Sequence, residues 1–273
     1  MKKFVRIRTH NSSSRPLRGA ILVDNWAICR LGSLTPTREC FTTPRSNIIE
    51  VNTVDAIQNS RSKLRMKACF ATKNVPQSEW WTYIPGQNIF PVRGEGDRGE
   101  AIATLPFPLV VKRVFGFQGR GMELLKNQKE LTEWLQKHRD IDGWYFEKFY
   151  NYAREYRLHV ARYCGVILSW RKLRTKDAES RWFFNSLNSN WVGTEHGLFD
   201  KPKCWSAMEK AAIDCIEATG LDIGAVDIRV QSNTQEDPKF IVCEINSAPA
   251  LGDLGIEVYK DIISKIIKNK ANE

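Results

Sequence analysis

The chain has 273 residues, of which 42% are hydrophobic and 26% are charged, and it carries a net charge of +10. This composition is typical of globular proteins and excludes a largely disordered chain. No apolar run approaches the roughly 18 residues of a membrane-spanning helix, and the basic start MKKFVRIRTH lacks the apolar stretch of a signal peptide. Seven scattered cysteines without a C-x-x-C pair argue against a disulfide framework or a zinc site. We therefore expect a soluble, cytoplasmic protein.

Short strand-like runs fill the first part of the chain, to about residue 57. They are FVRIR, GAILVDNWAI and NIIEV, and polar loops separate them. This pattern predicts a small α/β unit over 1–57. The stretch from residue 53 to 75, TVDAIQNSRSKLRMKACFATKNV, then predicts one amphipathic helix that ends before Pro76.

The segment FPLVVKRVFGFQGRGMELL predicts a strand, a glycine-containing loop and a second strand. Lys112 ends the apolar part of the first strand, and Gly116, Gly119 and Gly121 follow it. Glycines let backbone N–H groups approach phosphate oxygens, and an ammonium held on a strand adds a fixed positive charge. A plain hairpin turn stays an alternative, because the spacing of a Walker phosphate loop is absent.

The next elements are a helix, a strand and a hairpin. In NQKELTEWLQKHR, Asn127 stands three residues before Glu130, which is a capping-box pattern that begins a helix. WYFEKFY predicts a strand, and REYRLHVARYCGVILSWRKLRT predicts a hairpin that turns at Cys164-Gly165. Several basic residues near this hairpin are expected to share one face, which either binds a ligand or is solvated: Arg154, Arg157, Arg162, Arg171, Lys172, Arg174, Lys176 and Arg181.

The last third of the chain predicts a helix over 204–219 that Gly220 ends, two strands, AVDIRVQ and KFIVCEI, and a final helix in IEVYKDIISKIIKNK. Asp227 lies in the middle of the first strand, where a buried charge needs a partner or a metal. Glu244 and Asn246 stand two apart at the end of the second strand, so both point to one face. Three convergent oxygen ligands suit Mg²⁺, whereas Glu244 and Asn246 alone are more typical of a solvated strand end.

Six short motifs occur in the order of the ATP-grasp superfamily between about residue 53 and 253: SRSKLRMK, FPLVVKRVFGFQGRGM, YFEKFY, REYRLHV, GAVDI and VCEINSAPALG. Within it the chain resembles the amino-acid ligases related to glutathione synthetase, such as the glutamate ligase that modifies a ribosomal protein. The resemblance implies an α/β (α+β) ATP-grasp fold, in which two α/β subdomains clamp ATP behind a short N-terminal α/β domain over 1–57. The subdomain with the phosphate loop would be 58–148, and the subdomain with the metal site 149–273.

The resemblance also implies roles for individual residues. Lys63 and Lys112 would bind the ATP phosphates, Glu147 and the backbone around Phe149 the adenine, and Glu155 the ribose. The phosphate loop would add Gln118, Gly119, Arg120 and Gly121. Two Mg²⁺ ions, with Mn²⁺ as an alternative, would bind Asp227, Glu244 and Asn246. Arg157 and Arg171 would face the transferring phosphoryl group, and Lys172 is the alternative to Arg171.

The activity that the resemblance implies is ATP-dependent carboxylate-amine ligation through an acyl phosphate, with ADP as the nucleotide product. It would add an amino acid to a peptide, a protein or another amine, and an acidic acceptor would suit the basic charge. The N-terminal unit and the region 174–205 depart from the family pattern, so the substrates and the oligomeric state stay open. Two alternatives are an ATP-grasp kinase that stops at phosphoryl transfer and a basic nucleic-acid-binding protein, although no nucleic-acid-binding motif is present.

Overall fold

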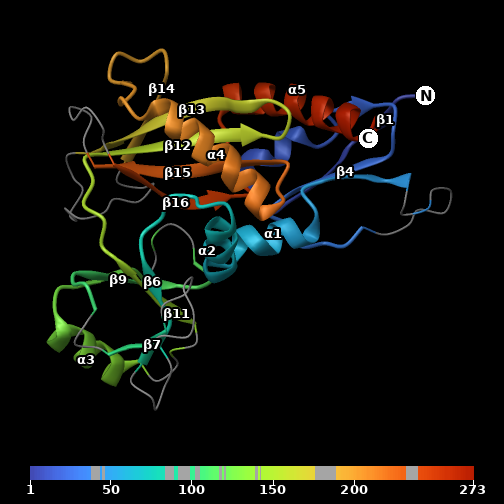
Figure 1. Cartoon of the computed structure of the whole chain (residues 1–273). Coiled ribbons are helices and arrows are strands. Elements are labelled where there is room, and N and C mark those ends of the chain that lie inside the picture. The colour runs from blue at the N-terminus through green and yellow to red at the C-terminus, as the bar shows by residue number, and fades with distance from the viewer. Residues whose placement is uncertain are drawn as a thin grey trace.

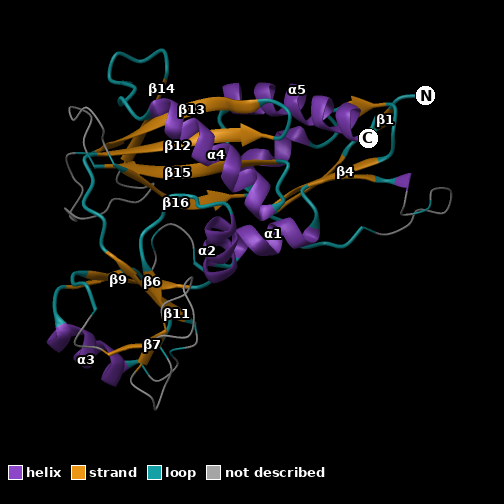
Figure 2. Cartoon of the chain, viewed as in Figure 1, coloured by secondary structure: helices purple, strands orange, loops and turns teal. Residues whose placement is uncertain are grey.

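A computed structural model describes residues 1–37, 44, 47–83, 89–91, 99–101, 105–116, 119, 121–138, 141, 143–175, 189–231 and 239–273. It has the expected mixed α/β architecture, with a larger lobe and a smaller lobe, each built on its own antiparallel sheet (Figures 1 and 2). Within these ranges, no helix combines the length and the apolar character that crossing a bilayer requires.

The larger lobe is built on a five-stranded antiparallel sheet in the order β14-β13-β12-β15-β16. Its strands are β12 (Arg154–Ala161), β13 (Gly165–Arg174), β14 (Ser189–Gly193), β15 (Ile223–Val230) and β16 (Phe240–Asn246). The hairpin of β12 and β13 turns where the sequence predicted, and Tyr163 and Gly165 adopt positive φ angles of 66° and 69° there. Such turn geometry is typical of tight hairpins and is easiest for glycine.

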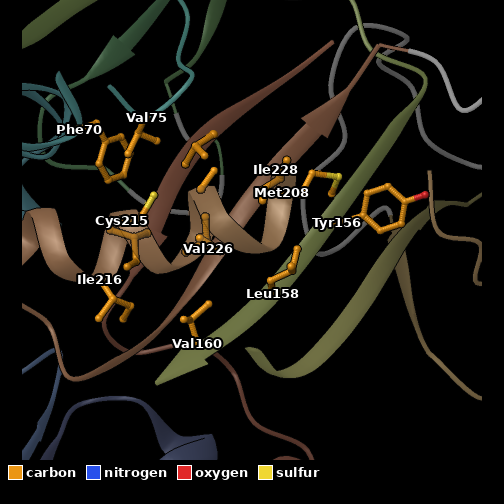
Figure 3. Close-up of a cluster of buried hydrophobic side chains, with 14 of the residues drawn as sticks. Phe70, Val75, Tyr156, Leu158, Val160, Met208, Cys215, Ile216, Val226 and Ile228 are labelled. Carbon is orange, nitrogen blue, oxygen red and sulfur yellow. The ribbon is translucent and has the colours of Figure 1, made fainter. Parts of the chain in front are cut away.

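Three helices cover one face of this sheet. They are α1 (Val54–Arg61), α2 (Lys63–Thr72) and α4 (Trp205–Thr219), which Gly220 ends in a left-handed conformation, as predicted. Figure 3 shows how side chains of β12, β15, α2 and α4 interdigitate in the resulting apolar core. The labelled members are Phe70, Val75, Tyr156, Leu158, Val160, Met208, Cys215, Ile216, Val226 and Ile228.

The N-terminal unit and the C-terminal helix α5 (Asp253–Lys270) share a second core against one end of the other sheet face. The unit contains a parallel sheet of β2 (Arg6–Thr9), β4 (Ala27–Leu31) and β5 (Ile49–Val51), a pair of β1 (Lys3–Phe4) and β3 (Leu22–Val23), and the 3-10 helix η1 (Ser12–Leu17). Leu31 and Val51 pack there with Tyr259 and Ile263. The two chain ends therefore lie close together (Figure 1).

The smaller lobe carries a four-stranded sheet in the order β10-β9-β11-β6. Its elements are β6 (Trp80–Trp81), β9 (Leu109–Arg113), β10 (Glu123–Leu125), α3 (Gln128–Lys137) and β11 (Trp144–Lys148), next to a separate pair of β7 (Ile89–Pro91) and β8 (Gly99–Ala101). The Asn127 side chain accepts a hydrogen bond of 3.0 Å from the Glu130 amide, which confirms the predicted start of α3. Leu131 and Trp134 bury one face of α3 on the sheet.

The single helix predicted before Pro76 is wrong, because the chain forms two helices that meet at Ser62. Ser62 has an extended backbone, with φ −83° and ψ 115°, and its hydroxyl accepts from the Arg65 amide at the start of α2. The break also frees the Lys63 amide, which donates to the Val114 carbonyl of the smaller lobe at 3.0 Å. The break therefore brings the first turn of α2 to the junction of the lobes. The predicted boundary near residue 58 falls inside α1.

Candidate active site

Charged side chains and one amide lie where the face of the five-stranded sheet opposite α4, here called the cleft face, meets the smaller lobe. They come from α2, β9 and β11 on one side and from β12, β13, β15 and β16 on the other. The residues are Lys63, Lys67, Lys112, Glu147, Glu155, Arg157, Lys172, Asp227, Arg229, Glu244 and Asn246. All the carboxylates among them pair with a basic residue, and the pairs form three groups.

The first group brings together the three predicted metal ligands. Asp227 lies opposite Glu244 in the register of β15 and β16, and a bulge follows Asp227. Asn246 Nδ2 donates to Asp227 Oδ2 at 3.3 Å and to Glu244 Oε1 at 3.2 Å. The three side chains therefore converge on one face, as their positions in the sequence predicted.

Two basic residues neutralise this group. Arg157 makes a bidentate pair with Asp227, Nε to Oδ1 at 2.7 Å and Nη2 to Oδ2 at 2.8 Å, and Lys63 Nζ contacts Glu244 Oε2. Burial raises the pKa of Glu244, but Lys63 outweighs burial and holds that pKa at about 2. Glu244 is thus presented as an anion, whereas burial, opposed by Arg157, raises the pKa of Asp227.

The donor set fits a hard divalent cation, because two carboxylates and an amide at one strand end match the oxygen ligands that Mg²⁺ prefers. This fit needs the side-chain amide of Asn246 as the third ligand. In the described part of the chain, no group of three or more His, Cys, Asp or Glu residues is arranged to hold a metal. Lys63 and Arg157 supply the compensating positive charge that a cation would otherwise supply.

The second group surrounds Glu147 in the middle of the smaller sheet. Glu147 is 2% exposed, and its carboxylate accepts from Lys67 Nζ at 3.2 Å, Lys112 Nζ at 2.5 Å and Tyr145 OH at 3.3 Å. Burial raises the pKa of Glu147, but Lys112 and Lys67 together bring it down to about 2. Sequence reasoning missed Lys67, although its spacing of four residues from Lys63 places both lysines on one helical face.

The third group surrounds Glu155. Its carboxylate accepts from Lys172 Nζ at 2.7 Å and from Arg229 Nε at 3.1 Å. The ring of Trp191 lies 4.5 Å from the Arg157 guanidinium carbon and 5.5 Å from Lys172 Nζ. Arg229 was not predicted, yet it stands two residues after Asp227 and so shares its face.

Arg171 lies on the opposite face of the sheet from Arg157, Asp227 and Lys172. Its register partner is the buried Tyr156, and its Nη1 contacts the Leu198 carbonyl at 2.5 Å and the Asp200 carboxylate. Alternate residues of a strand point to opposite faces of a sheet. The prediction that Arg171 shares one face with the other basic residues of the hairpin is therefore wrong, whereas Lys172 lies on the cleft face. Lys176 and Arg181 of the same predicted cluster lie outside the described residues.

The glycine loop connects β9 to β10, which pair as a hairpin. Gly119 and Gly121 both have positive φ angles, 68° and 71°, which favour glycine. A Cβ on Gly121 would lie 3.3 Å from the Trp144 ring, so this position also has little room for a side chain. Gln118 and Arg120 lie outside the described residues.

The backbone at the end of β11 is partly engaged within the smaller lobe. The Phe149 amide donates to the Pro108 carbonyl at 2.9 Å, and the Lys148 amide donates to the Glu79 carbonyl at 2.9 Å. These bonds hold the segment that follows Glu147 at the edge of the junction. Its amides at 148 and 149 are therefore used structurally.

Comparison with known proteins relies on structure, since no family model and no curated protein matches the sequence. The chain is similar to D-alanine-D-alanine ligase from Bacillus anthracis complexed with ATP, with a TM-score of 0.58 and 15% identity, covering 82% of this chain and 72% of that chain. It is similar to N5-carboxyaminoimidazole synthase from Aspergillus clavatus in complex with ADP and 5-aminoimidazole ribonucleotide, with a TM-score of 0.56, 15% identity, and coverage of 89% and 60%.

A third similar structure is the L-amino acid ligase from Bacillus licheniformis, with a TM-score of 0.52, 16% identity, and coverage of 79% of this chain and 50% of that chain. At these identities the likeness concerns the fold. All three have the ATP-grasp fold. The chain has the ATP-grasp fold that its motif order predicted.

Proposed function

We propose that this protein is an ATP-dependent carboxylate-amine ligase that forms an amide through an acyl phosphate and releases ADP. The observation that carries the proposal is the set of three carboxylate groups on the two sheets, each held by basic residues. Two of the similar structures are described with ATP or ADP, and all three are named as ligases or a synthase. These names support the reaction class and leave the substrates to experiment.

The nucleotide would bind among these three groups of charged side chains. Glu147 would accept the exocyclic amine of adenine, and Glu155 would accept a ribose hydroxyl. Lys112 and the backbone at Gly119 and Gly121 would bind the phosphates, because an ammonium and glycine-rich backbone amides are suited to anionic oxygens.

Asp227, Glu244 and Asn246 would hold the Mg²⁺ that accompanies ATP. When bound, Mg²⁺ neutralises charge on the transferring phosphoryl group. Lys63 and Arg157 lie against the same carboxylates, so both cations would also be available to the phosphates of a nucleotide bound at this group.

The reaction needs no protein nucleophile. A substrate carboxylate oxygen attacks the γ-phosphorus, the bond to the β-phosphate oxygen breaks, and ADP leaves. An amine then attacks the carbonyl carbon of the acyl phosphate, the carbon-oxygen bond breaks, phosphate leaves, and the amine loses a proton. Arg157 and Lys172 stabilise negative charge that develops on the phosphoryl oxygens and the leaving phosphate.

The acid is proposed to be an amino acid, and the acceptor an amine on a peptide, a protein or a small molecule. An acidic acceptor suits the net charge of +10. The Trp191 ring lies next to both Arg157 and Lys172, and we propose that Lys172 and Trp191 contact the acyl or acceptor group.

The test incubates the protein with ATP, Mg²⁺ and the amino acids one at a time, with candidate amines, and measures ADP release and the mass of the product. Hydroxylamine in place of the amine should trap a hydroxamate of the correct acid. Stoichiometric AMP and pyrophosphate would contradict the mechanism. ADP with a stable phosphorylated product and no ligated or trapped acid would show a kinase.

A further inference from the structure

The Glu147 carboxylate has two ammonium partners that differ in accessibility. Lys67 Nζ lies 3.2 Å from Oε1, and the Lys67 side chain is 1% exposed. Lys112 Nζ lies 2.5 Å from Oε2, and the Lys112 side chain is 13% exposed. Lys67 is therefore enclosed behind the carboxylate, while Lys112 reaches it from the cleft.

The position of each lysine explains this difference. Lys112 is on β9, the strand that leads into the glycine loop, and it pairs in register with Tyr145 of β11. Lys67 is on α2, and its carbonyl accepts from Gln77 Nε2 at 3.1 Å. Burial lowers the pKa of Lys67, and Glu147 opposes that shift. The ammonium of Lys67 thus depends on Glu147 as its charged partner.

We propose that Lys67 is a positioning residue, the permanent counterion of Glu147, which lets Lys112 leave that carboxylate for the phosphates when a nucleotide binds. The inference rests on the proposed function, because it takes Lys112 as a phosphate ligand. A single ammonium cannot bind Glu147 and a phosphate group several ångströms away at once. A buried carboxylate left without a cation is strongly unfavourable. With Lys67 in place, Glu147 keeps one cationic partner and its orientation after Lys112 has moved.

A charge count gives the same conclusion. Before binding, two ammoniums and one carboxylate leave a net charge of +1, which attracts a phosphate. After Lys112 moves, the buried Lys67–Glu147 pair is neutral. Without Lys67, Lys112 would be the only ammonium that contacts Glu147. Neutralising Glu147 and binding the phosphates would then compete for one lysine.

The test is a double-mutant cycle on nucleotide binding, measured by titration calorimetry with Mg-ATP or a non-hydrolysable analogue and without acid or amine. Lys67→Met in the presence of Glu147 should weaken binding at least about tenfold, whereas Lys67→Met in the Glu147→Gln background should weaken it by less than about threefold. Equal losses in both backgrounds, or no loss in either, would overturn the proposal. Lys73→Met is the matched control, because Lys73 follows the same helix and pairs with Glu217 at the surface.

A second measurement needs no variant and so does not depend on whether Lys67→Met folds. In a crystal structure of the wild-type protein with Mg-ADP, Lys67 Nζ should remain within hydrogen-bond distance of Glu147, and Lys112 Nζ should contact a phosphate oxygen. Lys112 still bound to Glu147 would contradict the inference. Absence of Mg-ATP binding by the wild type would instead refute the proposed function. Normal wild-type binding with an unaffected Lys67→Met variant refutes the role of Lys67 alone.

Discussion

The two faces of the five-stranded sheet differ in chemistry although the same strands build them. On the helix-covered face, Tyr156 and Leu158 of β12 and Ile228 of β15 are fully buried among apolar side chains. On the cleft face, the alternating residues Arg157 and Asp227 form an ion pair. The difference shows that a shift of one residue along a strand exchanges a stabilising position for a candidate catalytic one.

The cleft face is itself divided along its strands. Toward the turn of the β12–β13 hairpin, Ala161 packs under α5, and toward the start of β12, Glu155 lies among basic residues. His159 and Arg157 lie between these two parts. Each prediction below tests this contrast between faces or between the two parts of one face.

The largest effect is expected on the cleft face, at the metal-ligand group. Glu244→Gln removes the charge but keeps the size of the side chain, so the fold should remain while Mg²⁺-dependent ADP formation falls at least about a thousandfold. ADP release measures the loss, and thermal unfolding checks the fold. Full activity of this variant would contradict the metal assignment.

On the helix-covered face, a charge should disrupt the fold and not the chemistry. Val226 is fully buried next to Asp227. Val226→Asp places an unpaired carboxylate in the apolar core, so the free energy of unfolding should fall by about 4 kcal/mol or more. Urea denaturation measures this change, with Val226→Ala as the milder control. An Asp variant as stable as the Ala variant would show that this face tolerates charge.

The adjacent pair Arg171 and Lys172 tests both faces with one kind of substitution. Lys172→Met should lower kcat about 100-fold, because it removes a cation from the cleft. Arg171→Met should leave kcat within about twofold and cost about 1 kcal/mol of stability, because it removes a partly exposed contact with Asp200. Steady-state kinetics and denaturation of both variants measure this. The reverse pattern would restore Arg171 as the catalytic candidate.

At the boundary between the two parts of the cleft face, His159 should make the stability of the fold depend on pH. His159 is buried, its Nδ1 lies 3.0 Å from Tyr259 OH, and burial, with Arg157 adding to it, lowers the pKa of His159 to about 3. The unfolded chain binds this proton near its ordinary pKa of about 6.5, so stability is present above that pH and is lost progressively toward pH 3.

Between pH 7 and 5 this histidine should contribute a loss of about 2 kcal/mol in the free energy of unfolding. Urea denaturation at both values measures it. In His159→Gln the pH dependence should be weaker by about that amount. An unchanged dependence would mean that His159 is not buried in its neutral form.

The smallest effect is expected from the general positive charge. If the excess of basic residues attracts an acidic acceptor, its KM should rise severalfold with ionic strength, because attraction between exposed charges is screened over about 8 Å at physiological salt. Initial rates at several salt concentrations measure this, with kcat as the internal reference. A constant KM would show that these charges only solvate the surface.

Local features of this protein were predictable from the sequence, since they depend on residues a few positions apart. Asn127 caps α3 through Glu130, Gly220 ends α4, and the hairpin turns before Gly165, as predicted. The same holds for Glu244 and Asn246, because a spacing of two residues on a strand determines a shared face. The motif order also indicated the ATP-grasp fold.

Tertiary structure alone decided the contacts that join distant segments. Lys67 forms an ion pair with Glu147, which lies 80 residues further along the chain. At the break between α1 and α2 at Ser62, the Lys63 amide donates a hydrogen bond to the Val114 carbonyl. Which face of the β12–β13 hairpin is the cleft face depends on which side of the sheet α4 covers. This packing places Lys172, and not Arg171, on the cleft face. The physical reason is that hydrogen bonding and strand alternation act over a few residues, whereas the pairing of buried charges is determined only when whole elements pack against each other.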